Sequence, residues 1–361
     1  MFATSTFRRT EDNNNNKIMV AMSGGVDSAA CATMLGRAGF DVCGAVIRFS
    51  AASDGCVTAA ESACRTLGIP LVVIDAREDF EREVVTPFCA AYCSGRTPSP
   101  CVMCNPRVKF ARLLRAADEA GCAKIATGHY ARVEGQNGGF VLRSAICTPR
   151  DQSYMLYALG QQVLSRLVLP LGSVESKADM RALASEAGLE CAKTPDSQEI
   201  CFIPDGDYAA FIHARNLHGA EGHFIAPDGT DIGPHLGVEN YTVGQRRGLN
   251  VALGKPVFVR EICPGGDIKL AFSGGEYSAA ITVGNLVLNP CYDAQNLPPL
   301  TVKIRSAAKK APCTLKIEPD GTALITFDTP ARAPASGQAA VLYDGEYVVG
   351  GGEIARCMPT E

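Results

Sequence analysis

The chain lacks any apolar run that approaches the roughly 20 residues a helix needs to cross a bilayer. Residues 1–17 also lack the apolar segment of a secretory signal peptide, so we expect a cytoplasmic protein with no membrane contact. These residues are polar and include Asn13-Asn14-Asn15-Asn16, and they predict a disordered tail over residues 1–16. A net charge of −4 over 361 residues argues against broad, nonspecific nucleic-acid binding but allows a local basic surface.

The absence of a secretory signal also decides how the cysteines are interpreted. The chain has 16 cysteines, and outside an oxidising compartment these indicate free thiols, metal ligands or redox groups rather than a disulfide scaffold. We expect most of them to be small buried hydrophobic residues, as at Cys31 and Cys43, which lie in apolar stretches.

Strand-like and helix-like segments alternate from about residue 17 to residue 204. The predicted strands are 18–22, 41–49, 70–75 and 124–127, and the predicted helices are 29–35, 58–67 and 110–120. This alternation predicts an α/β fold with a doubly wound parallel sheet, in which ligands lie at the carboxyl ends of the strands.

The pattern changes after about residue 205. Residues 222–254 are rich in Gly and Pro, and from about residue 278 the chain reads as short strands with turns. The predicted strands are 280–283, 300–304, 314–317, 323–327, 339–343 and 346–349, with Asp344-Gly345 as a two-residue hairpin signal. We therefore expect a domain over 17–205, a small central domain over 206–277 and a C-terminal β-barrel over 278–361.

The most informative segment is Ser23-Gly24-Gly25-Val26-Asp27-Ser28, between the first predicted strand and the first predicted helix. Glycines let the backbone approach phosphates closely, and the helix start supplies N–H groups and the positive end of a dipole. No Lys follows the glycines, so this is not the loop of phosphoryl-transfer ATPases. It resembles the loop of the PP-loop ATP-pyrophosphatase superfamily, whose members transfer AMP to an oxygen.

Three further segments carry candidate chemistry. Thr127-Gly128-His129-Tyr130 lies at a strand end, and this position favours a functional His over a buried structural one. Cys101-Val102-Met103-Cys104 presents two thiols from one turn, suited to a metal, a cluster or redox work, or to a structural zinc completed by Cys89 and Cys93. Cys201 follows the polar run 196–199, which indicates a functional loop.

These motifs, in this order and spacing, resemble the tRNA-specific 2-thiouridylase family from about residue 17 to residue 353. The motifs that carry the resemblance are 23–28, Gly95-Arg96-Thr97-Pro98, Cys104-Asn105, 127–130, Asp151-Gln152-Ser153-Tyr154, Cys201-Phe202-Ile203, 241–249 and 337–343. The resemblance implies an ATP-binding domain of PP-loop type, a central domain and a C-terminal β-barrel. It further implies a tRNA-uridine 2-sulfurtransferase that adenylates the 2-oxygen of the wobble uridine in tRNAs for Lys, Glu and Gln and replaces it with sulfur.

The resemblance also implies the roles of individual residues. Cys104, Cys201 and Asp27 would be catalytic, with Mg²⁺ neutralising the triphosphate. ATP would be held by Ala21, Met22, Ser23, Gly24, Gly25, Val26, Asp27, Ser28, Ile47 and Gly128. The tRNA would meet Ser99, Pro100, Cys101, His129, Arg150, Asp151, Gln152, Arg305, Ser306 and Gln338, and a sulfur-donor protein would be a second partner.

One departure from the family keeps two sulfur routes open, since many members have Asp where this chain has Cys101. In the first route Cys201 carries a persulfide, and a disulfide between Cys104 and Cys201 remains after sulfur transfer. In the second, Cys101, Cys104 and Cys201 hold a [4Fe–4S] cluster whose fourth iron stays open. The extra cysteine favours the second route slightly.

The tRNA footprint is expected to be local and basic. Runs of charge are ordinarily solvated surface, but three stretches are candidates for binding tRNA phosphates. They are Arg107, Lys109, Arg112 and Arg115; Gln245-Arg246-Arg247; and Lys303, Arg305, Lys309 and Lys310. Two rival functions remain: an adenylating enzyme of the same superfamily that acts on a small molecule, and a thiol-rich module that binds RNA or senses a metal.

Overall fold

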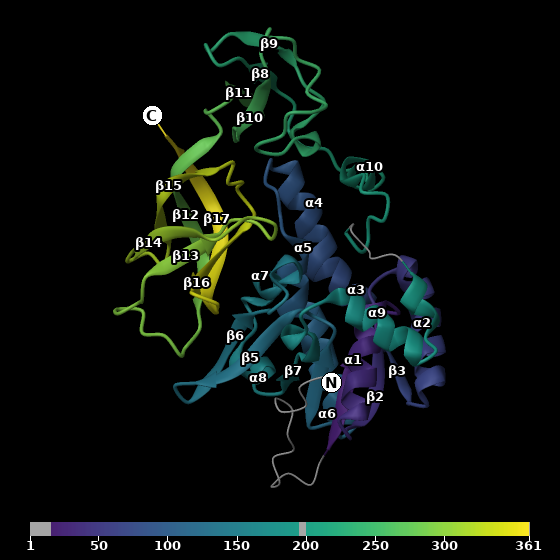
Figure 1. Ribbon diagram of the computed structural model, residues 1–361. Coiled ribbons are helices and arrows are strands. Elements are labelled where there is room, and N and C mark those ends of the chain that lie inside the picture. Colours follow the sequence, from purple (N-terminus) through teal and green to yellow (C-terminus); the bar gives the residue numbers. More distant parts are fainter. Residues whose placement is uncertain (1–15, 195–199, 361) are drawn as a thin grey trace. The chain divides into compact units, whose positions relative to one another are not determined.

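The computed structural model describes residues 16–194 and 200–360, and the chain divides into two compact units (Figure 1). The first unit joins Met1–Glu83 to Met103–Phe202, and the second joins Val84–Val102 to Ile203–Glu361. The predicted tail over residues 1–16 lies, except for Asn16, outside the described residues, and so does the polar run that precedes Cys201. Within the described ranges, no helix is both long enough and apolar enough to span a membrane.

The first unit is built on a five-stranded parallel sheet. Its order is β3 (Leu71–Asp75), β2 (Asp41–Arg48), β1 (Lys17–Ala21), β4 (Lys124–Thr127) and β7 (Leu167–Val168). The order runs outward from β1 in both directions, so the sheet has a topological switch point between β1 and β4. The predicted parallel sheet is confirmed.

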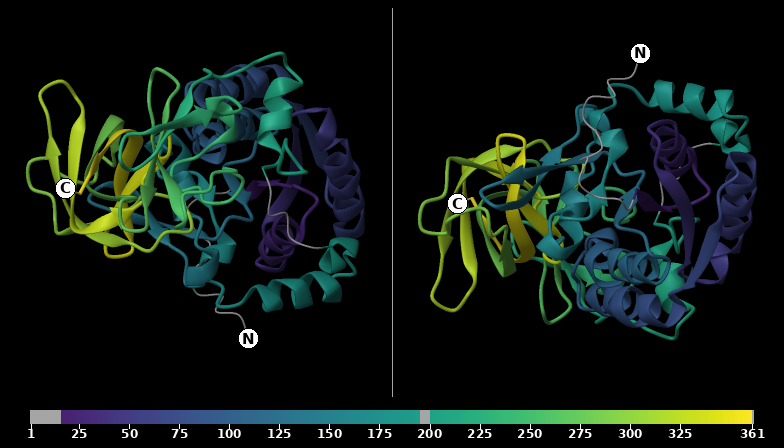
Figure 2. Two further views of the ribbon diagram at one scale, coloured as in Figure 1. Left: turned by 90° about the horizontal axis from the view of Figure 1, so that it is seen from above. Right: turned by 90° about the horizontal axis from the view of Figure 1, so that it is seen from below.

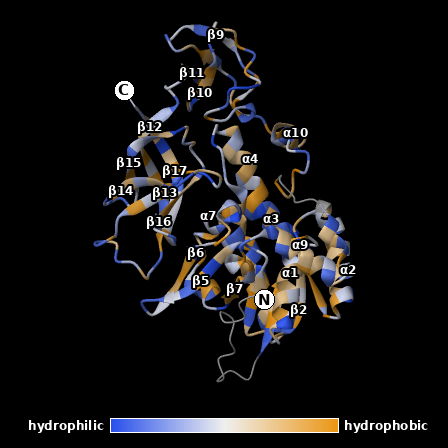
Figure 3. Cartoon of the chain, viewed as in Figure 1, coloured by the Kyte–Doolittle hydropathy of each residue, from blue (hydrophilic) through white to orange (hydrophobic). Residues whose placement is uncertain are grey.

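Helices cover both faces of this sheet. On one face, α1 (Val26–Arg37), α2 (Asp54–Leu67) and α9 (Lys177–Glu186) share a hydrophobic core with alternate residues of β1, Ile18 and Val20. On the other, α6 (Phe110–Glu119) contacts β1 and β4, because successive strand residues point to opposite faces. The helices of this unit show both hydrophilic and hydrophobic residues in Figure 3, as helices with one face on a sheet should.

Short elements follow β4 in the first unit. An antiparallel hairpin comes first, and four-residue helices then lead to α9. Their bounds are β5 (Ala131–Gln136), β6 (Gly139–Ser144), α7 (Ser153–Leu156) and α8 (Gln161–Leu164), while α3 (Arg77–Phe80) follows β3. The hairpin loop is Asn137-Gly138, a two-residue hairpin signal in which both residues have positive φ, whereas the strands carry Arg, Glu and Gln and show no clear alternation.

The second unit begins with α4 (Thr86–Cys93), and α5 (Pro100–Cys104) runs from this unit into the first. After α10 (Tyr208–His213), a four-stranded sheet has the order β10 (Val257–Ile262), β11 (Ile268–Phe272), β8 (His223–Ile225) and β9 (Asp231–Pro234). Its small core includes Phe224, Tyr241 and Val259.

The second unit ends in a closed antiparallel barrel, drawn in light green to yellow in Figure 2. Its strands follow the order β12 (Tyr277–Leu288), β15 (Ala323–Arg332), β14 (Ala311–Ile317), β13 (Leu300–Lys303), β16 (Ala339–Asp344) and β17 (Tyr347–Pro359). Pairing of β12 with β17 closes the barrel around Ile281, Leu342 and Ile354. The predicted C-terminal β-barrel is confirmed.

Candidate active site

The loop after β1 lies at the switch point and turns sharply into α1. The Ser23 amide donates to Ser28 Oγ at 3.1 Å, and Ser28 Oγ donates to the Gly25 carbonyl at 2.9 Å. Gly24 has φ +77°, and an added Cβ would lie 2.7 Å from Ala59 Cβ of α2. The loop is therefore held in one conformation by its own serines, and Gly24 has no room for a side chain.

The start of α1 leaves its first amides available to a ligand. Gly25 is the N-cap residue, and within the described chain no side chain caps this end of the helix. The helix begins at Val26, so the N–H groups of Val26, Asp27 and Ser28 belong to its first turn. A helix start of this kind binds anions through its N–H groups and its dipole.

Gly128, just after β4, packs directly against that first turn. A Cβ at this position would lie 2.7 Å from the carbonyl carbon of Asp27 and 2.8 Å from the amide nitrogen of Ser28. Only glycine allows this approach, and it brings the segment 127–130 beside the loop 23–28, 100 residues apart in the sequence. Ala21 and Met22 lead into the loop, where the Met22 amide donates to Ala45 of β2, and Ile47 lies buried farther along β2.

Asp27 is held by two donors from distant parts of the first unit. The Tyr130 hydroxyl donates to Asp27 Oδ1 at 2.9 Å, and Lys177 Nζ, at the start of α9, donates to Oδ2 at 2.8 Å. The Lys177 side chain is only 12 % exposed and that of Asp27 30 %. Burial raises the pKa of Tyr130, and the Asp27 charge raises it further, so the phenol stays a donor. The carboxylate is thus fixed in position at the helix start.

His129 sits beside this group with a neutral ring. Its Nδ1 lies 2.7 Å from Thr127 Oγ1, and its ring is near that of Phe110. Burial lowers the pKa of His129 well below its usual value, and Lys109 lowers it further. A neutral imidazole can hydrogen-bond a ligand without adding charge to the site.

The predicted tRNA-contacting residues 150–152 differ in their environments. Arg150 is exposed. Gln152 Oε1 accepts from the Tyr130 amide at 2.9 Å, and Asp151 accepts from the amides of Ala145 and Ser153. Asp151 and Gln152 therefore support the backbone around 130 and 153, whereas Arg150 presents its charge to solvent.

The thiols of the C-x-x-C motif lie one turn apart on α5. Cys101 is exposed and Cys104 buried, and Cys201 is exposed in the turn that ends the first unit. Cys104 and Cys201 belong to the first unit and Cys101 to the second, and a common site for the three thiols stays a prediction. Among the described residues, Cys89, Cys93 and Cys101 do not form a three-ligand cluster, so the structural-zinc alternative gains no support.

Asn105, next to Cys104, is a residue to which the sequence analysis gave no role of its own. It is 1 % exposed, and its Nδ2 donates to the Met155 carbonyl at 2.8 Å. Its buried Oδ1 has no hydrogen-bond partner within residues 16–194 and 200–360. Asn105 ties the end of α5 to α7 and leaves one acceptor beside Cys104 unused.

The other predicted tRNA-contacting residues lie in the second unit. The Ser99 carbonyl accepts from the Val102 amide, so Ser99 and Pro100 form the start of α5. Arg305 is exposed and donates to the Arg332 carbonyl at 3.3 Å, Ser306 is half-buried beside it, and the backbone of Gln338 pairs with Ile354. These residues belong to the C-terminal barrel except for Ser99 and Pro100.

The cations of the three basic stretches are not equally available for binding tRNA phosphates. Arg112 forms an ion pair with Asp79, and Arg115 pairs with Glu119 at 3.0 Å. Lys303 is buried, and Lys310 lies over the Tyr343 ring. By contrast, members of each stretch remain exposed, namely Arg107, Arg246, Arg247, Arg305 and Lys309.

Lys177 is the functional candidate that the sequence analysis missed. The loop 23–28 has no lysine of its own, and the ammonium group that contacts Asp27 belongs to Lys177, 150 residues later in the sequence. The only local signal is the cap of α9, where Ser176 Oγ accepts from the Ala178 amide and marks Lys177 as the first helical residue. A helix start alone does not predict which loop its side chains meet.

Comparisons with known proteins agree with this architecture. Three family models match consecutive parts of the chain: a tRNA methyl transferase HUP domain over residues 16–205, a tRNA methyl transferase PRC-barrel domain over 210–266, and an aminomethyltransferase β-barrel domain over 280–354.

Curated relatives match over nearly the whole chain. A protein of Syntrophotalea carbinolica named tRNA-specific 2-thiouridylase MnmA is 43 % identical over 94 % of this chain and 99 % of its own length. Proteins of the same name from Koribacter versatilis and Clostridioides difficile are 40 % and 36 % identical, each over 95 % of this chain. They cover 100 % and 99 % of their own lengths.

Proposed function

This chain belongs to the tRNA-specific 2-thiouridylase MnmA family, and on that premise we propose that it is a tRNA-uridine 2-sulfurtransferase. It adenylates the 2-oxygen of the wobble uridine with ATP and then replaces that oxygen with sulfur, acting on tRNAs for Lys, Glu and Gln. The observation that carries the proposal is the switch-point loop with Gly128 against α1 and Asp27 held between Tyr130 and Lys177. We keep the division into an ATP-binding domain 17–205, a tRNA-contacting domain 206–277 and a barrel 278–361 as part of this proposal, together with a cytoplasmic location.

The first step is activation of a poor leaving group. A uracil oxygen leaves only after AMP is attached to it, so the 2-oxygen attacks the α-phosphate and pyrophosphate departs. The amides of the loop 23–28 and the start of α1 suit the negative charge of that pyrophosphate. Lys177 supplies a nearby cation, and the exposed part of the Asp27 carboxylate offers the oxygen donor that Mg²⁺ prefers.

The second step is sulfur transfer, for which a donor protein would load Cys201 with a persulfide. The terminal sulfur attacks C2 and AMP leaves. The Cys104 thiolate then attacks Cys201 Sγ, which releases 2-thiouridine and forms the Cys104–Cys201 disulfide. An external dithiol must reduce this disulfide before the next turnover.

A cluster on Cys101, Cys104 and Cys201 is the other sulfur route. The donor set fits, because three thiolates are the ligands that a [4Fe–4S] cluster takes when one iron stays open. Two of the three thiols are exposed and Cys104 is buried. When bound, the cluster would supply the sulfur from its open iron in place of a persulfide.

The experiment that separates the routes compares iron content with thiolation in Cys101→Asp. We expect this variant to fold, because Cys101 is exposed on α5. Loss of bound iron together with loss of 2-thiouridine supports the cluster. Full thiolation with no iron bound removes the cluster and leaves the persulfide.

The assay that tests the function itself measures ATP cleavage with and without tRNA. Stimulation by tRNA supports the proposal, whereas cleavage that ignores tRNA would favour a small-molecule adenylating enzyme. Asp27→Ala addresses a module that only binds RNA, because such a module would lose nothing on this change.

A further inference from the structure

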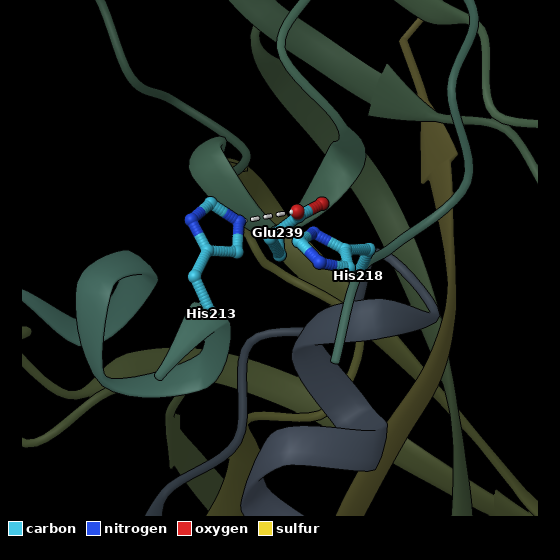
Figure 4. A group of neighbouring side chains, drawn as sticks. All are labelled: His213, His218 and Glu239. Atoms are coloured by element: carbon cyan, nitrogen blue, oxygen red, sulfur yellow. Dashed lines mark hydrogen bonds and ion pairs between the residues drawn. The ribbon is translucent and has the colours of Figure 1, made fainter. Parts of the chain in front are cut away.

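A group of metal-ligating side chains lies in the second unit, away from the loop and the thiols described above. It consists of His213 at the end of α10, His218 in the segment that follows, and Glu239 in the short helix Val238–Asn240 (Figure 4). Their ligand atoms all lie within 4.8 Å of one another. His213 Nε2 is 2.8 Å from Glu239 Oε1, and the two imidazole rings stack with centroids 5.0 Å apart.

The carboxylate of Glu239 is the unusual member of this group. Glu239 is 1 % exposed, and its Oε2 is buried with no hydrogen-bond partner anywhere in residues 16–194 and 200–360. A buried carboxylate oxygen without a donor or a cation is costly, because burial removes the water that would otherwise solvate it. His213 satisfies one oxygen and leaves the other, which points to a further positive partner.

Two glycines provide the space for this carboxylate. A Cβ on Gly219 would lie 2.5 Å from Glu239 Oε2, and a Cβ on Gly237 would lie 2.4 Å from the same atom. Both glycines are close in sequence to the ligating residues, since Gly219 follows His218 directly and Gly237 begins the turn into Val238–Asn240. Any side chain at either position would displace the oxygen.

We propose that His213, His218 and Glu239 bind a divalent transition-metal ion, with zinc the best fit. Two imidazole nitrogens and one carboxylate oxygen are a common zinc set, and water would complete the tetrahedron. Two imidazole ligands make Mg²⁺ and Ca²⁺ poor candidates, because both ions prefer oxygen ligands. The ion would join α10, the segment with His218 and the helix Val238–Asn240, which directly precedes the Tyr241–Leu249 motif.

The rival explanation is an ion pair between His213 and Glu239, with His218 stacked on it. That arrangement needs no metal and leaves Glu239 Oε2 unsatisfied. It makes His218 dispensable, since His218 is exposed and is there only a neighbour of His213. The two explanations therefore differ most sharply at His218.

The test is a Co²⁺ and Zn²⁺ titration of the full-length protein after chelator treatment without oxygen. Co²⁺ is used because thiolate ligands add charge-transfer bands, which distinguish this site from the chain's cysteines. The variants are His218→Ala and Glu239→Gln. The control is His223→Ala, whose exposed ring pairs with Asp231 at 2.6 Å and is no part of the group.

The proposal predicts one equivalent of tetrahedral Co²⁺ without thiolate bands in the native chain and in the control. Affinity should fall at least about 10-fold in both variants. Zinc should raise the thermal midpoint of the native chain and not that of His218→Ala, which is expected to fold because His218 is exposed. The proposal is overturned if the native chain and His218→Ala bind Co²⁺ with equal affinity. It is also overturned if Co²⁺ binds only with the charge-transfer bands of thiolate ligands.

Discussion

At the scale of single residues, the Asp27 carboxylate in the candidate active site is held at both of its oxygens. A tyrosine hydroxyl and a lysine ammonium hold its two oxygens, and both donors lie in regions with little access to water. A carboxylate fixed in this way loses little freedom when it meets a ligand, which is what preorganisation of a site requires. Its position therefore depends on residues that the loop motif itself does not contain.

Lys177→Met tests whether that lysine takes part in ATP cleavage. We expect the rate of tRNA-stimulated ATP cleavage to fall about 100-fold, because a preorganised cation beside the phosphates is removed. A pyrophosphate-release assay measures it. Lys316→Met is the control, since Lys316 is exposed on the barrel and pairs with Glu318 at 2.8 Å. Equal rates in the two variants would limit Lys177 to a structural role.

His129 predicts how stability depends on pH. Its pKa in the folded chain lies below the value of 6.5 that an unperturbed His has. The unfolded chain therefore binds more protons below about pH 6.5, and stability falls as the pH falls through that value. The slope is at most about 1.4 kcal/mol per pH unit.

Urea unfolding of the native chain and of His129→Asn between pH 7.5 and about pH 5 measures this contribution. The native chain should lose more stability over this range than the variant does. Parallel pH profiles for the two proteins would mean that His129 titrates normally in the folded state.

At the scale of elements, the contact between Gly128 and α1 sets the geometry of the switch point. Gly128→Ala places a methyl group within 3 Å of backbone atoms of Asp27 and Ser28, which cannot move without shifting the helix. We expect a loss of about 1–3 kcal/mol in the free energy of unfolding and a marked rise in KM for ATP.

Gly135→Ala is the matched control for that prediction. It lies on β5 of the same unit, and its added Cβ would lie 3.9 Å from the Gly139 carbonyl oxygen, which is ordinary van der Waals contact. Chemical denaturation and ATP-cleavage kinetics compare the two variants. If Gly128→Ala behaves like Gly135→Ala, neither stability nor ATP cleavage depends on the close approach of Gly128 to α1.

Periodicity predicted the elements that have strong local signals. The strands of the parallel sheet carry continuous apolar runs, and Gly68 ends α2 in the left-handed conformation expected of a C-cap. The helix starts were predicted less well: α1 begins at Val26 and α2 at Asp54, three and four residues before the apolar runs at 29 and 58. In the described chain neither start has a side-chain cap, so no local capping signal marks it.

Other features depend on tertiary contacts and could not be predicted locally. The hairpin after 344 is present, but Asp344 pairs with Tyr347, so the two-residue loop is Gly345-Glu346 and not Asp344-Gly345. The β5–β6 hairpin is an exception, because its Asn137-Gly138 loop is a local hairpin signal even though charged residues obscure the alternation of its strands. The partners of Asp27 come from residues 130 and 177, and no spacing rule joins them.

At the scale of the whole molecule, the proposal requires tRNA to bind a chain with a net charge of −4. Binding must then depend on a few exposed cations, among which Arg305 is a family-implied contact. Arg305→Gln should weaken tRNA binding. It should also reduce the slope of log affinity against log salt concentration by about 1, the change expected for the loss of one phosphate contact.

Filter binding at several salt concentrations measures this slope, with Lys316→Gln as the control on the same barrel. ATP binding should be unchanged in both variants. If the salt dependence of tRNA affinity in Arg305→Gln equals that of the native chain, Arg305 does not contact a tRNA phosphate.

In the proposed reaction one chain couples ATP cleavage to sulfur transfer, and Cys201 acts in the second step only. Its most direct test is mass spectrometry of nucleosides from tRNA incubated with ATP and a sulfur source, together with pyrophosphate release. We predict no 2-thiouridine but retained pyrophosphate release for Cys201→Ala, and both activities for Cys56→Ala, another exposed cysteine. Formation of 2-thiouridine by Cys201→Ala at the native rate would contradict the account.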